Sequence, residues 1–176
     1  MTLGAVLAGG QSSRFGSDKA LAVLDGQTLL TRAVATLAQW CDAVVVVGRD
    51  EAPAPTIPDW PRAQMGPLGG IAAALRHGAA NGHAHVLTCG VDSVGLPDDL
   101  PARLSPPPAY LADQPVVGLW PASAADDVAA ILQGTGKHSL RALAERLGAR
   151  AVTLAIHPAN INTPADLANL ENRDGV

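Results

Sequence analysis

The sequence is poor in aromatic residues and in cysteine. Aromatic side chains make up 3% of the 176 residues, and the only two cysteines, Cys41 and Cys89, lie far apart with no CxxC spacing. This excludes a disulfide framework and gives no sign of a zinc site, so a reduced, cytoplasmic setting fits best. Hydrophobic residues still make up 48% of the chain. The length therefore predicts one globular domain with a core of small aliphatic side chains.

The sequence also lacks an excess of positive charge and any long apolar run. The formal net charge is −4, whereas nucleic-acid-binding domains usually gather Lys and Arg on one face. No stretch reaches the roughly 18 uninterrupted apolar residues of a membrane span, and no signal-peptide pattern opens the chain. We therefore expect neither nucleic acid nor a membrane as a partner. Any anionic ligand has to be held by local positive groups.

A glycine-rich loop with two cations is present near the start of the chain. Residues 7–19 read LAGGQSSRFGSDK and follow an apolar run that predicts a first strand. Glycines allow consecutive N–H groups to turn toward one anion, and Arg14 and Lys19 can hold phosphate oxygens. The spacing matches neither the dinucleotide fingerprint GxGxxG nor the Walker loop GxxxxGK[ST]. For the glycines alone, an ordinary strand-to-helix turn remains the alternative.

The rest of the chain alternates between strand and helix patterns. Unbroken apolar runs predict buried parallel strands over 3–7, 43–47 and 85–89, and residues 51–61, dense in proline, predict a surface loop. We expect the other elements as helices over 28–40, 66–78, 97–104, 125–133 and 138–147 and strands over 110–112, 116–120 and 150–156. The predicted fold class is α/β: a single-domain, Rossmann-like three-layer sandwich with a mostly parallel sheet and helices on both faces.

Two more segments are expected at the edge of the sheet where the first loop lies. The segment GPLGG opens the helix at residue 66, and helix N-termini offer free N–H groups to anions. Asp92 follows the strand over 85–89, and ligands gather at the carboxyl ends of parallel strands. Asp92 is therefore expected to lie at the same edge of the sheet as the first loop. The alternatives are close helix packing for Gly69 and Gly70, and a plain turn for Asp92.

Four motifs carry a family resemblance in the same order along the chain. LAGGxSxRxGxDK, GPLGG, CGVDSVGLP and the closing NTPADL together resemble the nucleotidyltransferases that activate sugars and cofactors, and most closely the molybdenum cofactor guanylyltransferases. LAGG resembles the guanylyl-transferring branch, whereas cytidylyl-transferring relatives more often carry LAAG. The resemblance implies the nucleotide-diphospho-sugar transferase fold. It also implies transfer of GMP from GTP to molybdopterin that carries molybdenum, with pyrophosphate released.

The resemblance also implies roles for individual residues. Arg14, Lys19 and Asp92 are the expected catalytic groups, and Asp92 is the expected ligand of Mg²⁺, for which Mn²⁺ can substitute. The expected nucleotide-binding residues are Leu7, Ala8, Gly9, Gly10, Lys19, Gly69 and Asp92. They fall in a nucleotide-binding part over residues 1–100 of a single nucleotidyltransferase domain, 1–176.

The second substrate is expected to contact residues 101–176. Asn162 belongs to NTPADL, although Thr163, Pro164 and Asp166 also form a complete helix-start signal. Lys137 and Arg141 could meet the anionic pterin, although a charge cluster at a helix start is often just surface. The resemblance also suggests molybdoenzyme apoproteins, or their chaperones, as partners that receive the cofactor.

Two departures from the family pattern concern selection of the base. After the second strand the family often has Asn, where this chain has Gly48 and Arg49, and before GPL it often has Asp, where this chain has residues 63–65, AQM. Three alternatives to guanylyl transfer also stay open. They are a cytidylyltransferase that acts on the same pterin, a nucleotidyltransferase for a sugar phosphate, and a nucleotide-binding protein without turnover.

Overall fold

A seven-stranded sheet forms the centre of the protein, in the order β10-β8-β9-β6-β1-β4-β5. The computed structural model describes residues 1–10 and 16–174. From the first edge to the other, the strands are β10 (Arg150–Val152), β8 (Ala109–Leu111), β9 (Gly118–Pro121), β6 (His85–Gly90), β1 (Thr2–Leu7), β4 (Ala43–Val47) and β5 (Thr56–Ile57). Strand β1 lies between β4 and β6 and is parallel to both. The loop that follows β1 therefore begins at the middle of the sheet's carboxyl edge.

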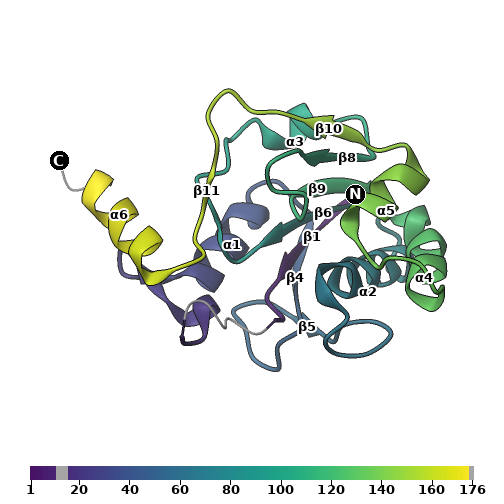
Figure 1. The fold of residues 1–176 in the computed structure, drawn as a ribbon, viewed down its shortest axis with the longest axis horizontal. Coiled ribbons are helices and arrows are strands. Elements are labelled where there is room, and N and C mark those ends of the chain that lie inside the picture. Colours follow the sequence, from purple (N-terminus) through teal and green to yellow (C-terminus); the bar gives the residue numbers. More distant parts are fainter. Residues whose placement is uncertain (11–15, 175–176) are drawn as a thin grey trace.

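Helices cover both faces of this sheet, which confirms the predicted three-layer fold (Figure 1). Helices α2 (Gly66–Ala80), α4 (Ala125–Gln133) and α5 (Leu140–Leu147) pack on one face, and α1 (Leu29–Ala38) and α3 (Leu100–Leu104) pack on the other. Side chains alternate along β1 and β4 because successive Cβ atoms point to opposite faces. Val45 and Val47 enter the α2 layer, while Val46 enters the α1 layer.

The sheet is parallel except at β9, within the described part of the chain. Strand β9 runs antiparallel to both β6 and β8, and β10 then pairs parallel with β8. Trp120 of β9 is fully buried and donates its indole N–H to the Thr88 hydroxyl at 3.0 Å. Trp120 thus lies where β9 pairs with β6, and aliphatic side chains make up most of the core cluster around it.

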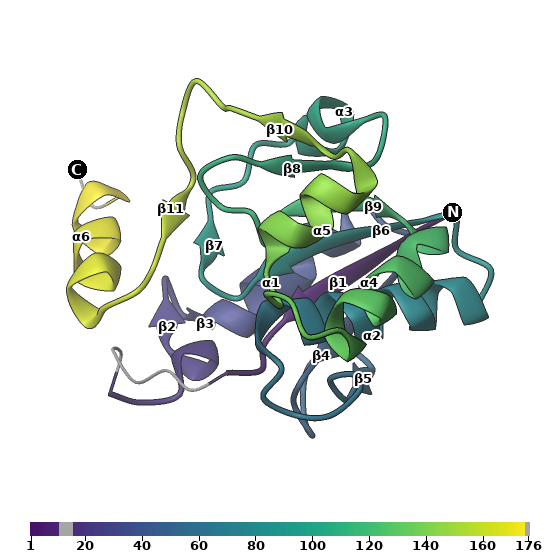
Figure 2. The same cartoon turned by 45° about the vertical axis from the view of Figure 1, so that its right-hand side comes forward.

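A C-terminal arm leaves the sheet after β10 and returns to the carboxyl edge. It contains β11 (Ala159–Asn160), which pairs with β7 (Ser93–Val94), and helix α6 (Pro164–Asp174). Figure 2 shows α6 beside the short hairpin of β2 (Val23–Leu24) and β3 (Gln27–Thr28), away from α2 and α4. Leu167 and Leu170 pack there against a small buried cluster that includes Leu24.

The structure corrects several expectations about element boundaries, such as the helix expected over 97–104, which begins at Leu100. The proline-dense segment over 51–61 is not only a loop, because Thr56–Ile57 forms the edge strand β5 between Pro55 and Pro58. An edge strand tolerates flanking prolines, since one of its sides has no partner. The strand expected over 150–156 ends at Val152, where the C-terminal arm begins. No helix in the described part combines the length and the apolar character that a bilayer crossing requires.

Candidate functional site

A cavity of about 320 Å³ opens at the carboxyl ends of β1 and β6. Its lining includes the start of the glycine-rich loop, the short helix η1 (Lys19–Leu21) and the segment that follows β6. Lys19 Nζ lies 3.1 Å from Asp92 Oδ2, and the two side chains are 16% and 24% exposed. The partly buried ion pair places a cation and a carboxylate together in one cavity. The sequence separates these residues by 73 positions, and the parallel sheet brings them into contact.

A second cavity of about 260 Å³ adjoins the first and shares Leu7, Gly9, Gly10, Gly66 and Pro67 with it. Asp59, from the loop after β5, also lines the second cavity. Within the described residues, no donor hydrogen-bonds to the Asp59 carboxylate, and burial raises its pKa above the usual value. A carboxylate that is half-buried, without a donor, and open to a cavity is suited to a ligand with N–H groups.

Close backbone packing shapes this second cavity. A Cβ added to Gly48 would lie 2.7 Å from Gly9 Cα, and Gly48 has φ +84°, so only glycine fits at this position. Gly70 lines the cavity, whereas Gly69 packs under the loop that carries Asp59. A Cβ added to Gly69 would lie 2.6 Å from Met65 Cβ, and its carbonyl accepts the Trp60 N–H at 3.2 Å. Gly69 thus fixes the loop, and its expected contact with a nucleotide stays a prediction.

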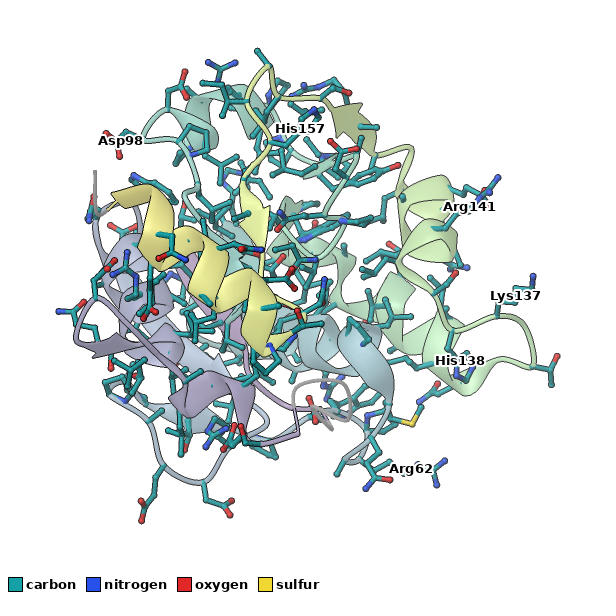
Figure 3. All side chains as sticks on the ribbon, turned by 60° about the vertical axis from the view of Figure 1, so that its left-hand side comes forward. Arg62, Asp98, Lys137, His138, Arg141 and His157 are labelled. Atoms are coloured by element: carbon teal, nitrogen blue, oxygen red, sulfur yellow. The ribbon has the colours of Figure 1, made fainter. Side chains whose placement is uncertain are left out.

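A third and larger cavity, of about 940 Å³, lies between α2, the end of β8 and α5. Pro67 lines this cavity as well as the first two. Arg141 and His138 contribute to its wall, and Arg141 forms an exposed pair with Glu145 at 2.8 Å. Lys137 extends away from the body of the protein, as Figure 3 shows. Of the two cations expected to meet the second substrate, Arg141 is therefore the better placed.

The C-terminal arm contacts the backbone of Asp92, a residue that lines the first cavity. The N–H of Ile161 donates to the Asp92 carbonyl at 3.1 Å, so Asn162 follows directly after a residue bound to the Asp92 backbone. The predicted helix start is confirmed. The Thr163 hydroxyl accepts the N–H of Asp166, and the Asp166 carboxylate accepts the N–H of Thr163 at 2.8 Å. The motif NTPADL thus both begins α6 and places Asn162 near Asp92.

The structure brings together most of the residues singled out from the sequence. Leu7, Ala8, Gly9, Gly10, Lys19 and Asp92 line one cavity. Arg14 lies outside the described residues. Sequence reasoning missed Asp59, because it sought an acidic residue directly before GPL and found 63–65, AQM. A usable signal was that Asp59 is the only acidic residue in the 14 positions from 52 to 65.

The chemistry of these groups favours binding and alignment of an anion. Burial raises the pKa of the Cys41 and Cys89 thiols to about 12, so neither supplies a thiolate near neutral pH. Among the described residues, no cluster of three or more His, Cys, Asp or Glu side chains forms a closed metal site. A single carboxylate, Asp92, can still bind a hard cation whose other ligands are water and phosphate oxygens.

Comparison with known proteins gives one consistent group of relatives. Residues 4–152 match the family described as the MobA-like NTP transferase domain. A molybdenum cofactor guanylyltransferase of Acidiphilium cryptum is 38% identical, with 92% of this chain and 90% of that protein covered. One of Rhizobium leguminosarum bv. trifolii is 39% identical, with 96% and 90% covered.

Solved structures give the same answer at the level of the fold. Molybdopterin-guanine dinucleotide biosynthesis protein A of Archaeoglobus fulgidus superimposes with a TM-score of 0.76 at 25% identity, covering 99% of this chain and 98% of that chain. A CMP:2-keto-3-deoxy-manno-octonic acid synthetase in complex with CTP superimposes with a TM-score of 0.72 at 13% identity, with 98% of both chains covered. The second similarity concerns the fold alone.

Proposed function

This chain belongs to the MobA-like NTP transferase family, and on that premise we propose that it transfers GMP from GTP to molybdopterin carrying molybdenum. The observation that carries the proposal is the pair of adjoining cavities at one sheet edge. One holds the Lys19–Asp92 pair and the other holds the Asp59 carboxylate. A nucleoside triphosphate has this division, with a polyanionic tail at one end and a base at the other.

The Asp59 carboxylate favours guanine over cytosine. Guanine presents two neighbouring donors, N1–H and the N2 amino group, to an acceptor with two oxygens, whereas cytosine presents one amino group beside acceptor atoms. Because no described residue donates to Asp59, guanine would satisfy an otherwise unpartnered carboxylate. Asp59 thus supplies the acidic group that the sequence segment 63–65 lacks.

The phosphate end supplies charge and alignment. Lys19 and the N–H groups of Gly9 and Gly10 are the proposed contacts of the triphosphate, and Asp92 is the proposed ligand of Mg²⁺ or Mn²⁺. One carboxylate beside a cavity fits such a cation, which keeps several waters and takes phosphate oxygens as further ligands. The bound cation would neutralise charge on the phosphates.

The reaction is an in-line displacement at the α-phosphorus of GTP. The terminal phosphate of the pterin attacks, a new P–O–P bridge forms, and the bond to the β-phosphate breaks, so that pyrophosphate leaves. A phosphate monoester is already largely a dianion near neutral pH, so no general base has to remove a proton. Lys19 has the task of offsetting charge while the groups are aligned.

The third cavity is the proposed site of the pterin. It has room for a ring system, it contains Tyr110 and Arg141, and it meets the nucleotide cavities at Pro67. The division into a nucleotide part over 1–100 and a pterin part over 101–176 belongs to this proposal. Molybdoenzyme apoproteins or their chaperones are the proposed recipients of the product.

Calorimetric titration with GTP and with CTP, in the presence of Mg²⁺, tests base selection. We expect native protein to bind GTP at least about tenfold more tightly than CTP, and Asp59→Asn to lose about tenfold or more in GTP affinity with little change for CTP. The amide keeps the size of the side chain but replaces one acceptor by a donor. Equal binding of GTP and CTP by the native protein would support the cytidylyltransferase alternative.

Product analysis separates the remaining alternatives. Pyrophosphate release from GTP should depend on molybdopterin and not on a hexose 1-phosphate. Release that responds only to the sugar phosphate would support the second alternative. GTP binding without pyrophosphate release in the presence of molybdopterin would support a protein without turnover.

A further inference from the structure

Arg49, which belongs to one of the two departures from the family pattern, forms a two-point ion pair with Asp18 beside the site. It follows the end of β4 by two positions. Its Nη1 donates to Asp18 Oδ1 at 2.9 Å and its Nη2 donates to Asp18 Oδ2 at 2.7 Å. The Arg49 side chain is 19% exposed. A planar fork that meets both oxygens of one carboxylate fixes orientation as well as distance.

Asp18 transmits this orientation to Lys19. Its Oδ1 also accepts the N–H of Ala20 at 3.2 Å, which caps the short helix η1. Helix η1 begins at Lys19, and the next residue, Ala20, is buried in the α1 layer. The backbone of Lys19 therefore lies between a clamped cap residue and a buried anchor.

Lys19 in turn reaches Asp92, so the contacts form a chain across the sheet edge. Arg49 lies after β4, Asp18 and Lys19 lie in the segment after β1, and Asp92 lies after β6. These three strands are neighbours in the sheet. We propose that Arg49 is a positioning residue that, through Asp18, sets the position of the Lys19 ammonium in the first cavity, the proposed site of the phosphates. The proposal deepens the function given above and rests on it.

Arginine can hold both carboxylate oxygens of Asp18, whereas lysine cannot hold both in the same fixed geometry. A lysine ammonium can make one strong contact with Asp18, and the carboxylate could then rotate about that contact. The cap on Ala20 depends on the same oxygen, Asp18 Oδ1, that receives Arg49 Nη1. Loss of the second contact should therefore loosen η1 even when the positive charge is kept.

The test compares Arg49→Ala, Arg49→Lys and Asp18→Asn in steady-state guanylyl transfer. We expect Arg49→Ala to lower kcat about tenfold while KM for GTP changes less than about threefold, because a displaced Lys19 affects alignment more than binding. Arg49→Lys should lie between Arg49→Ala and the native protein. The double variant Arg49→Ala/Asp18→Asn should have a kcat no lower than that of the less active single variant, since the two substitutions break the same contact.

Amide hydrogen exchange gives a readout that does not depend on turnover. Exchange over residues 16–22 should become faster in Arg49→Ala, where the cap on Ala20 loses its support. Arg32→Ala is the matched control, because Arg32 pairs with Asp25 at 3.4 Å on the hairpin before α1, outside the cavities. The control should leave kcat and the exchange of 16–22 unchanged.

The outcomes separate the two proposals. If the native protein shows no guanylyl transfer but exchange over 16–22 rises in Arg49→Ala, the proposed function is wrong. The proposed role of Arg49 in holding Asp18 and the Lys19 segment is then still supported. If transfer is present and Arg49→Ala leaves kcat and exchange unchanged, the proposed positioning role of Arg49 is wrong. A loss confined to KM for GTP, or additive losses in the double variant, would also overturn it, because Arg49 would then act on binding or independently of Asp18.

Discussion

The two ends of the site are built differently. At the proposed nucleotide end, Lys19, Asp92 and Asp59 are partly buried and stand at or near the ends of sheet strands. At the proposed pterin end, Arg141 is 87% exposed on a surface helix, and Lys137 extends away from the body of the protein (Figure 3). The side chains of the first set are partly enclosed by the protein, whereas those of the second set stand in solvent.

This difference has an energetic consequence. A charge in a partly buried cavity acts through a lower effective dielectric, whereas an exposed charge is screened by water and salt. Pre-positioned groups also lose little side-chain entropy on binding. Substitutions at the nucleotide end should therefore cost much more activity than substitutions at the pterin end.

The largest effect is expected at Asp92. Asp92→Ala removes the proposed cation ligand and leaves Lys19 without its carboxylate, so pyrophosphate release should fall at least about 100-fold. The matched control is Asp98→Ala on the same connecting segment, where the side chain is exposed and points into solvent (Figure 3). The control should keep nearly full activity. Retention of more than a tenth of native activity by Asp92→Ala would place the cation elsewhere.

The next largest effect is expected at Gly48, whose backbone shapes the second cavity, the proposed site of the base. Gly48→Ala should destabilise the protein by about 1–3 kcal/mol, because the new Cβ meets Gly9 at 2.7 Å and φ is +84°. The added methyl group also pushes β4 and the glycine-rich loop apart, so GTP affinity should fall more than about tenfold. Urea unfolding and GTP titration measure the two effects. Gly136→Ala, at an open position, is the control and should change neither.

The same contrast explains what could be predicted from sequence. Runs such as AVVVV over 43–47 and helical spacing over 28–40 are local signals, and both elements form as expected. The contact between Lys19 and Asp92 then follows from topology, because neighbouring parallel strands end at one edge. Local patterns plus the rule for parallel sheets were sufficient for this part of the site.

Asp59 and Arg49 could not be found in this way. Asp59 is placed by a tertiary contact, the hydrogen bond from Trp60 N–H to the Gly69 carbonyl, which no local pattern encodes. In the sequence, Arg49 is visible only as a departure from the family motif. Its partner Asp18 lies 31 positions away, so no local pattern links the two. The β2–β3 hairpin had a local signal, Asp25-Gly26, but its strands are only two residues long.

A smaller effect is expected at the pterin end. Arg141→Ala should raise KM for molybdopterin about two- to fivefold, the range of an exposed charge contact, and leave GTP affinity unchanged. Arg103→Ala is closely matched, because Arg103 also forms an exposed i,i+4 pair, with Asp99, but lies on α3 on the other face of the sheet. Equal effects of both substitutions would mean that overall charge, not the third cavity, governs binding of the pterin.

The smallest effect concerns the stability cost of Asp59. Burial raises the pKa of Asp59, so the Asp59 carboxyl group holds its proton more tightly in the folded protein than in the unfolded chain. The contribution of Asp59 to stability is therefore complete below its unfolded pKa and is lost as pH rises through its folded pKa. Asn is uncharged throughout this range.

Asp59→Asn should accordingly raise Tm near neutral pH by about 1–3 °C, and the gain should vanish on acidification. Calorimetric scans of both proteins from acidic to neutral pH measure the difference. Asp98→Asn provides the control, since its carboxylate is exposed and its scans should follow those of the native protein. A lower Tm for Asp59→Asn at neutral pH would show that the carboxylate stabilises the protein without ligand. This would contradict the expected cost of burying a carboxylate that no described residue partners.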